Sequence, residues 1–204
     1  DLQQYTTEIT KTPETPAPTK TEEPQAESES AEPSEPEPEP LSYPTEPPLA
    51  VDFESLKAIN PDVKGWLYIE ALDISYPVVQ GKNNSEYLKK TFSANENTLG
   101  TIFLNVDNNK DFSDRNTLIF GHRMKDGSMF RHLQDYEEKS FWEQNPYFYI
   151  YTVDGRILKY HIYSAGQVLD TSDSYQTAFE SDEAYQSFLD MTKSTALYDT
   201  GVEV

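Results

Sequence analysis

The chain has 204 residues and a formal net charge of −20 at neutral pH, and hydrophobic residues make up 36% of it. A protein that binds nucleic acid needs clustered lysine and arginine to neutralise phosphates, so this charge excludes that class of partner. The sequence contains no cysteine, so disulfides cannot stabilise it and give no sign of its compartment. No stretch approaches the roughly 18 apolar residues of a transmembrane helix, and no signal peptide is visible.

Composition divides the chain near residue 50. Residues 1–50 hold 11 of the 14 prolines and 12 of the 36 acidic residues, and they contain few large apolar side chains. The alternation of glutamate and proline in residues 32–40 cannot form a helix, because proline lacks an amide donor and favours extended geometry in the residue before it. We therefore predict a disordered, acidic, proline-rich stalk at 1–50, whose charges are solvated rather than used to bind a cation or a partner.

Residues 51–204 are enough for one domain with a sizeable core. Asp52 is a suitable N-cap for a first helix, which Pro61 ends. The apolar runs at 66–70 and 74–80 then predict two strands.

The middle of this domain has the pattern of short strands and helical turns. Residues 85–90 predict a helical turn, and residues 100–105 and 116–120 predict strands. The second of these strands ends in the continuously apolar residues 118–120, which favours burial on both faces. Two short helical patterns follow at 129–135 and 139–144.

A β-hairpin is the clearest pattern in the second half. Residues 147–153 and 156–163 flank Asp154 and Gly155, a pair that favours a two-residue type I′ turn, because both turn positions need positive φ. We expect the tyrosines of the first strand to face the core. The turn predicts these cross-strand pairs on that face: Tyr147 with Ile162, Tyr149 with Tyr160, and Tyr151 with Leu158.

The last part of the chain predicts one more helix. Ser181 is a suitable N-cap, and apolar residues follow it at helical spacing. Residues 200–204 have the pattern of a strand that is just beginning. Many short strands joined by small helices predict a mainly β fold, either a barrel or a sandwich.

His122 is the main candidate for catalysis. It follows the predicted strand 116–120 and Gly121, and strand ends are where rigid scaffolds present side chains to clefts. An imidazole in that place could act as a general acid or base near neutral pH. A histidine after a strand is more often structural, so the motif around it has to support the assignment.

The other candidate residues favour structural roles. His132 lies on a short helical pattern and His161 on a strand, and separate histidines without cysteine or an HExxH pattern argue against zinc. Residues 107–114 superficially resemble a calcium loop, but Phe112 stands where glycine is required. No phosphate-binding loop or nucleophile elbow is present, and nothing marks Ser128 as activated. We expect no cofactor and no metal.

Residues 52–204 resemble a class B sortase, one of the cysteine transpeptidases that join proteins to the cell wall of Gram-positive bacteria. The resemblance depends above all on residues 116–130, where an apolar strand, Gly-His and Met-Lys-Asp-Gly-Ser-Met-Phe follow one another in the family's order. Four weaker stretches support it jointly: residues 60–69, 76–80, 87–92 and 100–103.

The resemblance implies an eight-stranded barrel in which His122 stands at the end of a strand. A cysteine thiolate on a later strand attacks the threonine carbonyl of a sorting signal, and the histidine protonates the leaving amine. An arginine on a still later strand steadies the developing oxyanion, and an amine of a cell-wall precursor resolves the thioacyl intermediate. Residues 80–92 correspond to a wall of the family's substrate groove.

Among these catalytic groups, His122 alone has a counterpart in the chain. There is no cysteine, and Arg123, Arg131 and Arg156 are not at matching places. We therefore expect a sortase-like barrel that is cut before its nucleophile, lacks the C-terminal strands and is inactive as a 204-residue chain. The expected partners are a sorting-signal peptide and a cell-wall amine at the outer face of the cell membrane, where an N-terminal anchor absent from this chain would hold the domain.

The missing strands also lead us to expect low stability. Exposing about 400 Å² of core would cost on the order of 10 kcal/mol, so the chain would partly unfold or associate through open sheet edges. The alternative function is a non-catalytic surface domain that binds a partner and is carried on the stalk. The coding sequence downstream of Val204 distinguishes the two.

Overall fold

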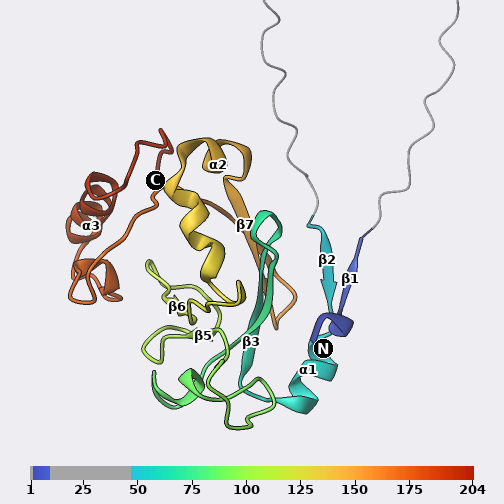
Figure 1. Cartoon of the computed structure of the whole chain (residues 1–204). Coiled ribbons are helices and arrows are strands. Elements are labelled where there is room, and N and C mark those ends of the chain that lie inside the picture. The colour runs from blue at the N-terminus through green and yellow to red at the C-terminus, as the bar shows by residue number, and fades with distance from the viewer. Residues whose placement is uncertain (1, 10–46) are drawn as a thin grey trace, which may run out of the picture.

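The computed structural model describes residues 2–9 and 47–204, and its centre is a six-stranded mixed sheet (Figure 1). The sheet curls into a half-barrel with short helices in its connections, which confirms the predicted mainly β fold class. Residues 10–46, with the alternation of glutamate and proline, lie outside the described residues. The strands in their order across the sheet are β6 (Ile119–Phe120), β5 (Phe103–Leu104), β4 (Ile74–Val79), β3 (Val63–Ile69), β7 (Tyr147–Thr152) and β8 (Ile157–His161).

Most of the helices lie in the connections between strands, while one precedes the first strand and two follow the last. All of those predicted from the sequence are present within a few residues of the expected bounds, although several are 3-10 helices. The α-helices are α1 (Phe53–Ile59), α2 (Lys139–Gln144) and α3 (Asp182–Ser194). The 3-10 helices are η1 (Leu2–Tyr5), η2 (Glu70–Leu72), η3 (Glu86–Leu88), η4 (Arg131–Glu137) and η5 (Asp173–Tyr175).

Side-chain caps begin the first and the last α-helix where the sequence predicts them. The Asp52 carboxylate accepts a hydrogen bond from the Ser55 amide at 3.0 Å, and the Ser181 hydroxyl accepts one from the Ala184 amide at 3.2 Å. Each cap satisfies an amide that the first helical turn leaves without a backbone partner. Both predicted N-caps are confirmed.

The sheet buries a hydrophobic cluster on each of its two faces. The inner cluster, inside the curl, is built on Leu67 and Ile69 of β3 and Ile150 of β7. The outer cluster takes the alternate residues, Trp66 of β3 and Tyr151 of β7, which contact α1 and the N-terminal elements. This alternation is what a pleated strand buried on both sides requires.

The hairpin of β7 and β8 has a register that differs by one residue from the prediction. The structure pairs Tyr149 with Lys159 and Ile150 with Leu158, so the tyrosines of β7 face the outer side. The reason is the turn: the Thr152 amide donates to the Arg156 carbonyl at 2.9 Å, which makes a three-residue loop instead of a two-residue one. A one-residue slip moves every side chain of a strand to the other face.

Two further expectations about strands were wrong in part. Of residues 116–120, Ile119 and Phe120 alone form β6, and both are half-buried instead of buried on both faces. The reason is position, since β6 is an edge strand that pairs with β5 alone. Residues 200–204 form no strand, because Gly201 has φ of 70° and the Thr200 hydroxyl bonds to the Tyr163 carbonyl.

Two pieces of the segment assigned to the stalk carry regular structure. Strand β1 (Thr6–Glu8) is antiparallel to β2 (Leu49–Val51), beside α1 (Figure 1). Leu2 and Tyr5 pack against the outer cluster, and this apolar contact is what the composition of residues 1–50 does not reveal. The division of the chain at residue 50 stays a prediction. No helix within residues 2–9 and 47–204 is long and apolar enough to cross a bilayer.

Candidate functional site

The candidate site lies at the end of β6, where Gly121 and His122 follow the strand. Any residue larger than glycine at 121 would collide with the core. An added Cβ would lie 2.3 Å from Ile102 Cδ1 and 2.9 Å from the Phe130 ring, where carbon atoms normally stay about 3.5–4.0 Å apart. Glycine therefore lets the chain pass against the inner cluster and turn outward at His122.

The residues after His122 form a tight turn that ties down its backbone. The Phe130 amide donates to the His122 carbonyl at 3.0 Å, and Arg123 forms an isolated bridge with Met129. Inside the turn, the Ser128 hydroxyl donates to the Asp126 carboxylate at 2.7 Å. This geometry explains why the Met-Lys-Asp-Gly-Ser-Met-Phe stretch follows the histidine: it folds the chain back onto the strand end.

The His122 imidazole is half-buried and is held by a backbone carbonyl. Its Nε2 lies 2.7 Å from the carbonyl oxygen of Leu88. A carbonyl can only accept, so Nε2 carries the hydrogen, and Nδ1 is the nitrogen that can take up or release a proton. The ring is thereby set in one tautomer, with one nitrogen available for acid–base chemistry.

Leu88 is itself fixed by a rigid neighbourhood. It ends η3, and the preceding residue, Tyr87, accepts a hydrogen bond from the Thr101 amide on its carbonyl at 3.0 Å. The Tyr87 hydroxyl donates to Asp62 at 2.8 Å and accepts from Asn60 at 2.9 Å. Burial, with the charge of Asp62, raises the pKa of Tyr87 to about 12. The segment 80–92 thus contacts His122, while its role as a groove wall stays a prediction.

A cavity of about 560 Å³ opens on the inner face of the half-barrel. It lies between β6 and β8, the two edges of the sheet, and α3 covers part of it through Phe188 and Leu189. His122 is not among the lining residues, although Ile119 and Phe130 on either side of it are. The Thr117 hydroxyl, also in the lining, is buried without a hydrogen-bond partner among the described residues.

The other sequence candidates are not brought to His122. His132 is an exposed residue of η4 that pairs with Asp135 at 3.3 Å, and His161 stacks on Trp142 and lies tilted against the Tyr147 ring. Burial and the nearby charge of Lys159 lower the pKa of His161. The structural roles expected for both histidines stay predictions.

In the loop that resembles a calcium site, amide groups of the loop itself bind the Asp114 carboxylate. The Asp114 carboxylate accepts from the Asn109 amide nitrogen at 2.6 Å and from the Asn108 side chain at 3.0 Å. Asn108 in turn accepts from the Leu118 amide at 2.9 Å, just before β6. Within residues 2–9 and 47–204, no cluster of three acidic or histidine side chains is placed to hold a metal ion. The loop therefore positions the strand that leads to His122.

Comparison with known proteins points to one family. The profile described as "Sortase domain" matches residues 67–194. Sortase B of Staphylococcus aureus is 36% identical over 154 residues, which are 74% of this chain and 62% of the relative. The chain thus spans less than two thirds of that relative's length.

Solved structures agree with the sequence comparison. A Staphylococcus aureus sortase B–substrate complex matches with a TM-score of 0.71 and 34% identity, over 74% of this chain and 70% of that one. Sortase B complexed with triglycine matches with the same TM-score and identity, over 74% and 71% of the two chains.

Proposed function

The chain belongs to the sortase family, and from that premise we propose that its domain serves a sortase-type cysteine transpeptidation in which His122 is the acid–base residue. The supporting observation is the held imidazole. His122 stands at a strand end, with Nε2 bound to the Leu88 carbonyl and Nδ1 left to exchange a proton. A group in that state can receive a proton from a thiol and pass it to a leaving amine.

The proposed reaction joins a surface protein to the cell wall. A thiolate attacks the carbonyl carbon of a peptide bond in a sorting signal, and the amine leaves with the proton that the imidazolium supplies. An incoming amine then attacks the thioester and releases the sulfur. The relatives solved with a substrate and with triglycine, which carries a terminal amine, support a peptide and an amine as the two partners.

The nucleophile of this reaction is not encoded in the 204 residues, which contain no cysteine. Ser128 does not replace it, because its hydroxyl donates to Asp126 within the turn. The 204-residue chain therefore supplies the scaffold and the imidazole, and on its own it is inactive. Its place of action is the outer face of the cell membrane, which follows from the cell-wall substrate.

A chimera tests this proposal. The residues of Staphylococcus aureus sortase B that follow its matched segment are fused after Val204, and cleavage of the peptide from the sortase B–substrate complex is measured. We expect turnover by the chimera, and none above background by the unfused chain or by the chimera with His122→Ala. Equal turnover with and without the imidazole would refute the role of His122.

A binding role without catalysis is the second candidate, and the open cavity of about 560 Å³ favours it. It predicts that the unfused chain binds a partner tightly while the chimera remains inactive. The same peptide, labelled with a fluorophore, measures both properties in one experiment.

A further inference from the structure

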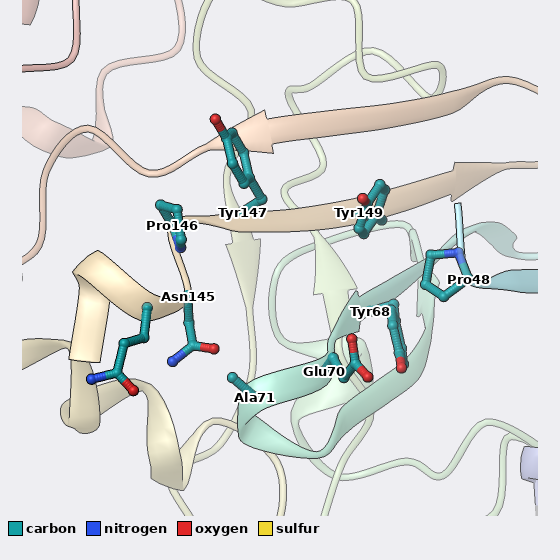
Figure 2. Close-up of a pocket in the computed structure, with 9 residues that line it drawn as sticks. Pro48, Tyr68, Glu70, Ala71, Asn145, Pro146, Tyr147 and Tyr149 are labelled. Carbon is teal, nitrogen blue, oxygen red and sulfur yellow. The ribbon is translucent and has the colours of Figure 1, made fainter. Parts of the chain in front are cut away.

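A second, smaller cavity lies on the outer face of the sheet, away from His122. Its volume is about 190 Å³, and it sits where β3 ends and β7 begins (Figure 2). We call it the tyrosine pocket after the rings that line it: Tyr68, Tyr147 and Tyr149. His122 follows β6, which is separated from β3 by β5 and β4, so this cavity is not part of the candidate catalytic site.

The sheet register gathers the three rings on one face. Tyr68 of β3 and Tyr149 of β7 are direct cross-strand partners, and Tyr147 lies two residues along the same strand. Pro48 lies at one end of the cavity, beside Tyr68 and Tyr149, while Asn145 lies toward the other end (Figure 2). Cross-strand partners share a face, so the rings together form one wall of the cavity.

A carboxylate stands against this wall. Glu70, the first residue of η2, is exposed and lies beside the Tyr68 ring (Figure 2). None of the ion pairs among residues 2–9 and 47–204 uses it. Burial, followed by the charges of Glu70, Glu8 and Asp73, raises the pKa of Tyr68 to about 12. Three carboxylates thus bring negative charge to the Tyr68 side of the pocket.

The same tyrosine wall already holds one ammonium group. The Lys159 nitrogen lies 4.1 Å from the centre of the Tyr147 ring and 6.0 Å from that of Tyr149. An ammonium at such a distance is attracted by the negative face of the ring. Lys159 is not among the residues that line the tyrosine pocket, so its ammonium does not fill the space between Tyr68 and Glu70.

These features select the chemistry of a ligand. A carboxylate repels anions, and aromatic rings with one carboxylate offer too few oxygen atoms for a hard metal ion. Rings around a carboxylate are instead the arrangement that recognises an organic ammonium group, which gains from the ring faces and from the negative charge together. A cavity of about 190 Å³ has room for the end of a lysine side chain or for a methylated ammonium head.

We propose that the tyrosine pocket binds an organic ammonium group, held by the faces of Tyr68 and Tyr149 and by the carboxylate of Glu70. Such a group is carried by a lysine side chain of a peptide and by a choline-type head group. The site is independent of the transpeptidation assigned to His122, and it gives the domain a second contact with a partner that carries the cation.

Matched ligands test this directly. The 204-residue chain, labelled with ¹³C in its tyrosine rings, is titrated with choline, with Nα-acetyl-lysine methylamide and with 3,3-dimethylbutan-1-ol, the neutral analogue of choline. We expect at least one of the two cations to shift the ring signals of Tyr68 and Tyr149 and to bind about tenfold more tightly than the neutral alcohol. The tighter of the two cations identifies the source of the ammonium group.

Variants separate the charge from the shape of the pocket. Glu70→Gln keeps the size of the side chain. It should weaken the binding of the cation about fivefold and leave the affinity for the neutral alcohol unchanged. Glu54→Gln, at an exposed carboxylate of α1, is the control and should change neither the affinity for the cation nor that for the alcohol. Equal affinity for cation and alcohol, no effect of Glu70→Gln, or no shift of these ring signals with either cation overturns the proposal. Far-UV circular dichroism confirms that both variants fold.

Discussion

Gly121→Ala is the sharpest test of how the core positions His122. The added Cβ would lie 2.3 Å from Ile102 Cδ1, more than 1 Å closer than the separation of about 3.5 Å at which carbon atoms attract each other. Ile102 is 1% exposed, and the Phe130 ring blocks the other side at 2.9 Å, so neither neighbour has free space. Overpacking of this kind costs about 1–3 kcal/mol of unfolding free energy.

Urea unfolding followed by fluorescence measures that cost, with Gly166→Ala as the control. At Gly166 the nearest atom to an added Cβ is the Thr195 carbonyl oxygen at 3.3 Å, a full 1 Å farther than Ile102 Cδ1 is from Gly121, so this variant should cost clearly less than Gly121→Ala. Ile102→Val removes Cδ1 and alone should cost about 0.5–1.5 kcal/mol. The double variant should cost about 1 kcal/mol less than the sum of the two single costs, because the clash with Ile102 Cδ1 is gone. Additive costs would show that the contact with Ile102 does not restrict residue 121.

Three further predictions concern protonation. Long-range ¹H–¹⁵N NMR should find the neutral His122 ring with its hydrogen on Nε2, which donates to Leu88, and a hydrogen on Nδ1 would contradict this geometry. Burial raises the pKa of Tyr87 and Tyr136 to about 12, so between about pH 10 and 12 the unfolded chain loses these protons first, and the unfolding free energy should fall with rising pH. Absorbance at 295 nm follows the tyrosines, and urea unfolding at each pH measures the stability. A folded chain in which every tyrosine titrates near pH 10 would refute the prediction. Burial lowers the pKa of His161 below its usual 6.5, so stability should decrease as pH falls from about 7 to 5, and His161→Gln should flatten that slope. An unchanged slope in that variant would exclude His161 as the cause.

The parts of the fold that could be predicted from the sequence are those that depend on neighbouring residues. Asp52 and Ser181 cap their helices through bonds to amides three residues on, and such bonds need no tertiary contact. The end of a strand at His122 was predictable for the same reason, since an apolar run followed by glycine is a local signal. The hairpin register was not, because the backbone bonds between Thr152 and Arg156 select a longer loop than Asp154 and Gly155 suggest.

The parts of the site that could not be predicted depend on backbone atoms and on distant strands. The partner of His122 is the carbonyl of Leu88, 34 residues earlier, and every residue type carries a carbonyl. The tyrosine pocket was missed because the wrong register had placed Tyr149 on the core face. In the structure Tyr149 of β7 pairs with Tyr68 of β3 on the outer face, and this pairing joins strands that are far apart in the sequence.

The pairing of β1 with β2 has a mechanical consequence. The Ile9 amide donates to the Pro48 carbonyl at 2.9 Å, so two points 39 positions apart along the chain are clamped side by side. A pull on the N-terminus is then borne by the contacts of residues 2–5 with the outer cluster and by the short ladder between residues 6–8 and 49–51. Lengthening or shortening the sequence between the clamped points would change the loop-closure free energy by only about 0.6 kcal/mol per doubling. While the pairing of β1 with β2 holds, such a change would not alter the distance between the N-terminus and the folded domain.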